Sequence, residues 1–277
     1  MAELASLFAL DLFRHAVLAA LLASVLCGVV GTFVVLKRLV AASGGIAHAA
    51  FGGLGAFYWL GLPPRLGAVG VAAAVSLVLS GSSRTARGQD AAIGVVWAVG
   101  MAIGLIFIHL TPGYAPSLMG FLFGDILLVS PGDLWLTAVA DLVVIVHVLL
   151  FGRRIVAVAF DEECARLQGI RVRAYSLLLL LLTALTIVVL LRLVGIVLVI
   201  ALLTIPPLVA LRLWRGLGAV VAGAVGVAAL QSVGGLLVAF RLDLPAGPVI
   251  VLLGALFLGL VQLRRPPRRR AAPGTAG

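Results

Sequence analysis

His48 is the single ionisable side chain in the run "AASGGIAHAAFGG" at residues 41–53, whose other members are small or apolar. Imidazole is a common ligand of transition-metal ions and adds no charge when it is neutral. Gly44, His48 and Gly52 are spaced by four residues, so on a helix they share one face. This pattern allows two interpretations. His48 is a metal ligand on a path between helices, or it is hydrogen-bonded within a close-packed face of small residues.

The depth of His48 favours the first interpretation. His48 follows Arg38 by ten residues, and at about 1.5 Å per residue this places it about 15 Å into a membrane-spanning helix. An ionisable group near the midplane of a bilayer is costly, and transporter sites tend to lie at that depth. We therefore predict that His48 is a transit ligand for a metal ion.

Three further residues within apolar segments are candidates for the transport path. Asp141 lies about two turns into a predicted span, where a carboxylate serves either an ion path or a helix–helix contact. Pro206 and Pro207 lie inside another apolar segment. Proline in a helix frees a backbone carbonyl and bends the chain, which suits a gate or pore wall as well as a static kink.

Composition places these residues in a polytopic all-α membrane protein. The chain has 277 residues, of which 63% are hydrophobic and 11% charged, and its mean hydropathy is +1.27. A soluble domain carries about twice that share of charge. No nucleotide-binding or catalytic motif is present, so we expect no enzyme activity in this chain and ATP hydrolysis only in partner subunits. The two cysteines suggest neither a disulfide framework nor a thiolate metal site.

Eight or nine apolar segments are predicted to cross the bilayer as helices, depending on whether the chain divides at residues 190–195, where Arg192 is the only break. They lie at 15–36, 39–61, 65–81, 91–109, 133–151, 174–191, 194–211, 217–240 and 247–263. The stretch 112–132 between the fourth and fifth is an outer loop or a short re-entrant piece. We predict one transmembrane domain over 1–265 and a basic, disordered tail over 266–277.

The distribution of basic residues predicts the orientation. With the N-terminus outside, the inner loops and tail hold 16 of the 20 Lys and Arg residues. This is the positive-inside pattern, and it puts the C-terminal tail in the cytoplasm, where it can contact anionic lipid. The net charge of +10 therefore does not indicate nucleic acid as a partner.

The inner loop predicted at 152–173 contains a short polar helix. In "DEECARLQG", Asp161 can cap the helix, acidic residues occupy its first turn and Gly169 can end it. Such a helix is a connector or a docking element for a cytoplasmic partner.

Nearly the whole chain resembles the permease subunit of bacterial ATP-binding-cassette importers for zinc, manganese and iron(II). The matching segments are 33–61, 93–108, 122–134, 159–170, 193–213 and 241–253. The resemblance implies a homodimer in the bacterial inner membrane, two cytoplasmic ATPase subunits and an extracytoplasmic solute-binding protein. It implies no permanently bound cofactor. It also implies that 159–170 is the coupling helix in the ATPase groove, with Asp161, Glu162, Ala165 and Gly169 matching best.

The resemblance also implies a metal site in the second span, where an aspartate and a histidine lie four residues apart. In this sequence the histidine is His48, but the aspartate position holds Gly44. Asp141 is the candidate for the missing carboxylate, while Gly44, Gly52, Pro206 and Pro207 are assigned to the pathway and gate. Two alternatives remain open, an importer of the same architecture for a metal chelate such as a siderophore, haem or cobalamin, and an ion transporter that needs no ATPase.

Overall fold

The computed structural model describes residues 11–81, 86–112 and 118–263, so the predicted tail and the domain boundary beside it lie outside the described residues. All regular elements within these ranges are helical. They are α2 (Asp11–Leu36), α3 (Val40–Trp59), α4 (Pro64–Gly81), α5 (Ala86–Leu110), α6 (Leu118–Phe123), η1 (Ile126–Leu128), α7 (Pro131–Phe160), α8 (Glu162–Leu167), α9 (Val172–Leu213), α10 (Leu217–Leu242) and α11 (Ala246–Leu263).

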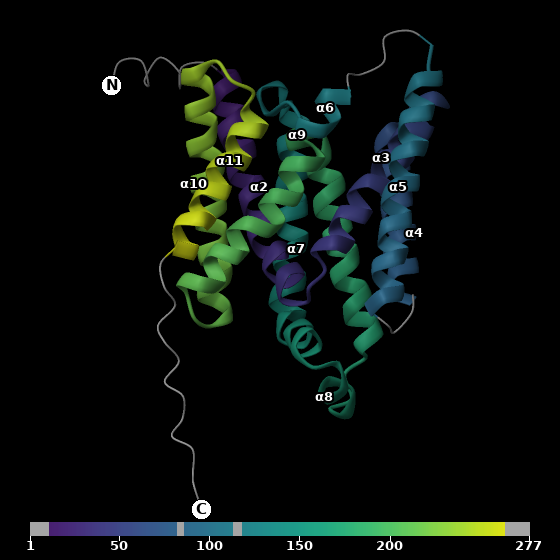
Figure 1. Cartoon of the computed structure of the whole chain (residues 1–277), viewed down its shortest axis with the longest axis vertical. Coiled ribbons are helices and arrows are strands. Elements are labelled where there is room, and N and C mark those ends of the chain that lie inside the picture. Colours follow the sequence, from purple (N-terminus) through teal and green to yellow (C-terminus); the bar gives the residue numbers. More distant parts are fainter. Residues whose placement is uncertain (1–10, 82–85, 113–117, 264–277) are drawn as a thin grey trace, which may run out of the picture.

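Eight of the described helices are long and apolar enough to cross a membrane. The longest, α9, has 42 residues and is interrupted at Gly195, where φ is +74°. A straight helix of that length would measure about 63 Å, twice the hydrocarbon thickness. In Figure 1, α9 instead turns back near its middle, so it crosses twice. Eight helices with one double crossing give nine crossings, which agrees with the predicted division of the segment near residues 192–194.

The turn at Gly195 depends on backbone contact with the segment after α6. Gly195 and Gly124 both have positive φ, and a Cβ on Gly195 would collide with the amide nitrogen of Gly124. Only glycine combines a left-handed backbone with this close approach at low cost. The stretch 112–132 therefore contributes the short helices α6 and η1, which lie at the end of the bundle opposite α8 (Figure 1). We call this the far end, and the other the α8 end.

Two groups of helices flank α9 (Figure 1). On one side α3 packs between α4 and α5, and on the other α2 packs on α7, α9 and α10. Glycines bring α3 and its neighbours together. A Cβ on Gly52 would lie 2.7 Å from the carbonyl oxygen of Gly100 on α5, and one on Gly53 would collide with the carbonyl oxygen of Gly67 on α4. The predicted small-residue face is therefore a real contact surface, and it presents His48 to α5.

Helix α7 is longer than predicted. The span was expected to end at residue 151 and to be followed by a loop over 152–173, but the helix continues to Phe160. Nothing between 152 and 160 breaks a helix, since one glycine is followed by arginine, valine and alanine, and Asp161 is the first residue to leave helical geometry. At its start, Ser130 and Asp133 form a reciprocal capping box. The α8 end therefore projects further than the sequence suggested.

Candidate transit site

His48 lies on α3 with 9% of its surface exposed. Its ring stacks on the indole of Trp97 on α5, with centroids 4.5 Å apart and planes inclined by 22°. Among the described residues, the buried Nδ1 atom has no hydrogen-bond partner. The structure therefore does not support the alternative in which a neighbouring helix holds His48 through a hydrogen bond to Nδ1. A buried nitrogen without a partner is costly unless a ligand or water satisfies it.

Gly44 lies one turn before His48 and faces the same indole. A Cβ on Gly44 would lie 2.9 Å from Cζ3 and 3.3 Å from Cη2 of Trp97. The space beside Gly44 is thus filled by the aromatic ring, which covers the glycine and stacks on the imidazole at once. Trp97 was not among the residues singled out from the sequence. Its signal was an isolated large aromatic in the otherwise small or aliphatic run "AAIGVVWAVG".

Asp141 lies in a different part of the bundle. It is buried on α7, and neither carboxylate oxygen has a hydrogen-bond partner in the described chain. Helix α7 packs on α2 and α9, whereas α3 packs on α4, α5 and α9. The chain does not join Asp141 and His48 into a site, and the described residues contain no group of three or more His, Cys, Asp or Glu that could hold a metal ion.

Pro206 and Pro207 are buried in the second half of α9. Pro207 has no N–H to donate to the carbonyl of Leu203, four residues earlier. That same carbonyl oxygen faces α2 at Gly31, where a Cβ would collide with it. The glycine therefore lets α2 approach the freed carbonyl closely. The prolines modify the contact between two central helices, as a gate or a static kink would.

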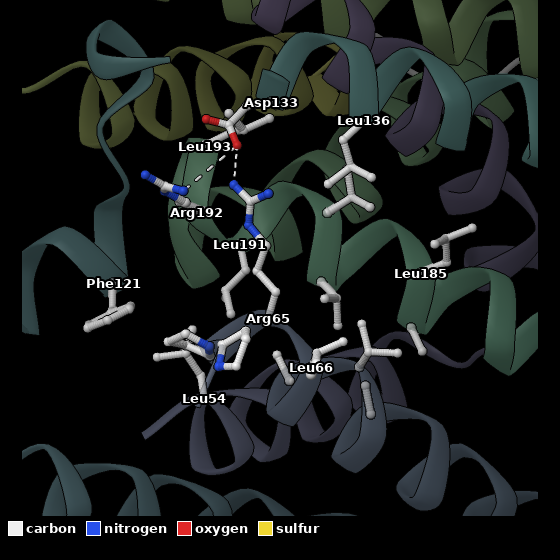
Figure 2. Close-up of a pocket in the computed structure, with 18 of the residues that line it drawn as sticks. Leu54, Arg65, Leu66, Phe121, Asp133, Leu136, Leu185, Leu191, Arg192 and Leu193 are labelled. Atoms are coloured by element: carbon white, nitrogen blue, oxygen red, sulfur yellow. Dashed lines mark hydrogen bonds and ion pairs between the residues drawn. The ribbon is translucent and has the colours of Figure 1, made fainter. Parts of the chain in front are cut away.

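A cavity of about 1060 Å³ opens at the far end between α3, α4, α7 and α9. Its walls are mostly aliphatic, and its charged lining residues are Arg65, Asp125, Asp133 and Arg192. Figure 2 shows Arg65 and Arg192 pointing toward the buried Asp133. Arg65 forms an ion pair with this carboxylate, and Arg192 lies 3.9 Å from it. Two guanidinium groups around one carboxylate disfavour a divalent cation, because like charges in low dielectric repel strongly. The cavity is therefore a poorer candidate for a cation site than His48.

The predicted short helix at 161–169 is present as α8. Asp161 accepts hydrogen bonds of 2.9 Å from the backbone N–H groups of Glu163 and Cys164. Ala165 is buried, and Gly169 ends the helix with φ of +76°. The apolar side chains of Phe160 and Leu167 are 75% and 89% exposed. Phe160 is the last residue of α7 and Leu167 the last residue of α8, so this end offers two exposed apolar side chains to a partner.

Helix α8 is tied to the start of α3 by an ion pair that the sequence did not predict. Lys37, in the turn between α2 and α3, places Nζ 2.9 Å from Oε1 of Glu162. The Lys37 side chain is only 11% exposed, whereas that of Glu162 is 53% exposed. The two residues are 125 positions apart in sequence. A displacement of α8 would therefore act on the turn between α2 and α3, which leads into the helix that carries His48.

These features define the class of the protein, a polytopic all-α membrane protein whose described residues contain eight helices long and apolar enough to span a bilayer and a short helix projecting at one end. The chain belongs to the ABC 3 transport family, which matches residues 9–264. The family membership agrees with the resemblance of the sequence to the permease subunits of ATP-binding-cassette importers.

Two relatives and one solved structure show how far the similarity extends. A "probable metal transport system membrane protein" of Chlamydia trachomatis is 37% identical and aligns over 94% of this chain and 92% of its own. The manganese transport system membrane protein MntC of Halalkalibacterium halodurans is 32% identical over 91% of this chain and 87% of its own. The structure of PsaBC from Streptococcus pneumoniae in complex with Fab matches with a TM-score of 0.85, 27% identity, and coverage of 97% and 98%.

Proposed function

We propose that this chain is the permease subunit of an importer that moves a divalent transition-metal ion into the cytoplasm, powered by ATP hydrolysis in separate subunits. The observation that carries the proposal is the buried imidazole of His48, whose Nδ1 has no partner in the described chain. Relatives named for manganese and metal transport support this class of cargo. A lone pair inside a membrane-spanning bundle can accept a passing cation without adding charge.

His48 acts as a transit ligand and not as a storage site. One imidazole from each copy of a homodimer, completed by water or backbone carbonyls, binds a divalent ion weakly. Weak binding suits transport, because the ion must leave as readily as it enters. Gly44 and Gly52 keep the wall beside His48 free of bulky side chains of α3. The unpartnered carboxylate of Asp141 is a further proposed ligand, at a separate point of the path.

The orientation of the permease follows from its charges. The loops and helix ends at the α8 end hold most of the basic residues that the structure describes, so we place this end in the cytoplasm and the N-terminus outside. An extracytoplasmic solute-binding protein delivers the ion to the far end. The protein lies in the bacterial inner membrane, and ATP binds only to the partner subunits.

Helix α8 transmits the work of the ATPase subunits. Asp161 caps the start of α8, and Gly169 ends it. Glu162 attaches the helix to Lys37, and the buried Ala165 packs it against the rest of the chain. Leu167 offers an apolar contact to a partner. When ATP binding moves α8, the Lys37–Glu162 ion pair carries the displacement to α3. The contact between α2 and the Pro206–Pro207 region of α9 is a second place where two helices can shift against each other. His48 is thereby exposed to one side of the membrane and then the other.

Replacement of His48 tests this function. We expect His48→Ala to lower uptake of radioactive zinc or manganese about tenfold or more in cells that express the permease with its ATPase and solute-binding protein, because the ion loses its ligand. Permease level and assembly with the ATPase are expected to stay constant. His147→Ala is the matched control, since His147 is a half-buried histidine bonded to Val143 of its own helix.

The other cargo classes give different results in the same system. Undiminished uptake in His48→Ala would overturn the role of His48. ATPase activity that responds to a metal chelate but not to the free ion would favour a siderophore-type importer. Uptake that persists without the ATPase subunit would indicate an independent transporter, for which the exposed apolar surface of α8 has no use.

A further inference from the structure

We propose that Gly44 and Trp97 together keep a carboxylate out of the transit site and so set its metal selectivity, an inference that rests on the proposed passage of a metal ion past His48. Trp97 occupies the place of a carboxylate beside the imidazole. The resulting site offers a nitrogen ligand and an aromatic face, and α3 contributes no carboxylate to it. Such a site favours ions that prefer imidazole, such as zinc, over manganese, which prefers oxygen.

The first support is the fit between Trp97 and Gly44. Cζ3 and Cη2 of the indole lie within 2.9 and 3.3 Å of the position that a Cβ at residue 44 would take. Contacts below 3.0 Å require one of the groups to move. An aspartate at residue 44 and the present indole conformation therefore exclude each other, so Gly44 and Trp97 act as a complementary pair.

The second support is that Trp97 is not an ordinary core residue. Its side chain is 40% exposed although one face of the ring covers His48. Gly94, one turn earlier on the same side of α5, has no atom within 4 Å of the position that a Cβ would take. The indole thus lies at the boundary between the packed α3–α5 contact and the open face of α5. An ion that reaches His48 from that face meets the indole at the same place.

The third support is chemical. A carboxylate beside His48 would bring a full negative charge and up to two oxygen ligands to a divalent ion. An indole face offers only its quadrupole, which attracts a cation more weakly and without a coordinate bond. Manganese binds imidazole less tightly than zinc does and gains more from a carboxylate ligand. An indole in place of a carboxylate therefore weakens manganese binding more than zinc binding. The native site should therefore pass zinc in preference to manganese.

Restoring the carboxylate tests the proposal. In the complete importer, we expect Gly44→Asp/Trp97→Ala to raise the ratio of manganese to zinc uptake about tenfold or more over the native ratio. Gly44→Asn/Trp97→Ala is the matched control, because asparagine has the shape of aspartate without its charge, and it should leave the ratio within about twofold. Trp135→Ala, which removes an exposed tryptophan of α7, should leave both uptakes unchanged.

The possible results separate the selectivity proposal from the proposed function. An unchanged ratio in the aspartate variant, with uptake still dependent on His48, overturns the selectivity role of the Gly44–Trp97 pair and leaves the proposed function intact. An equal rise in both double variants also overturns it, because volume and not charge would then set selectivity. Failure of the native importer to take up either metal overturns the proposed function and this inference together. If the double variant does not assemble, Gly44→Asp alone repeats the test, since the exposed ring can swing away from His48.

Discussion

Removal of the Lys37–Glu162 ion pair should uncouple ATP hydrolysis from transport. At 2.9 Å, two unit charges attract by about 6 kcal/mol at an effective dielectric constant of about 20. Desolvation of the largely buried Lys37 and solvent screening at the half-exposed Glu162 reduce the net contribution to about 1–2 kcal/mol. A loss of this size in the link between α8 and α3 corresponds to about a 5- to 30-fold fall in metal transported per ATP hydrolysed.

Lys37→Met is the suitable change, because methionine keeps the buried stem and removes only the charge. The assay measures metal uptake and ATP hydrolysis together in proteoliposomes that contain the complete importer. We expect hydrolysis to continue while uptake falls. The exchanged pair Lys37→Glu/Glu162→Lys should restore part of the coupling, but not all of it, because a lysine at the start of α8 opposes the helix dipole. Native coupling in Lys37→Met would refute the mechanical link.

Further predictions concern the glycines that set the architecture. Gly53→Ala should lower the free energy of unfolding by about 1–3 kcal/mol, because its Cβ collides with the Gly67 carbonyl and pushes α3 from α4. Gly70→Ala, on the open face of α4, should not destabilise the protein. Gly195→Ala should impair folding, because both the positive φ of this residue and its close backbone contact exclude a methyl group. Gly216→Ala is the comparison: it meets only the strain of a positive φ, which costs about 1 kcal/mol. Thermal unfolding in detergent distinguishes each pair; equal shifts within a pair would contradict the argument from close packing.

Several features could be predicted from the sequence because they depend on local interactions. Hydropathy summed over a segment identifies a span, and the basic loop residues predict its orientation. The N-cap of α8 at Asp161 and its end at Gly169 follow from backbone needs within one turn. The small residues around His48 predicted a close helix contact, which the α3–α5 packing shows.

The continuation of α7 beyond residue 151 was not predicted, because hydropathy marks the end of a membrane span and not the end of a helix. A membrane span ends where the apolar run ends, but a helix ends only where its backbone is broken or capped. Arg153 and Arg154 are compatible with helix, so α7 continues to Phe160. Hydropathy thus located the span and misjudged the helix.

The sequence by itself determined the class of protein, the crossings, the capped helix α8 and the candidate imidazole at His48. Only the tertiary structure decided what surrounds that imidazole. It placed Trp97 over His48 and Gly44, joined Lys37 to Glu162, and kept Asp141 on a different helix contact. These pairings depend on which helix faces meet, and in a membrane nearly every face is apolar. Close approach of backbones at glycines selects the faces, and that selection cannot be read from one segment alone.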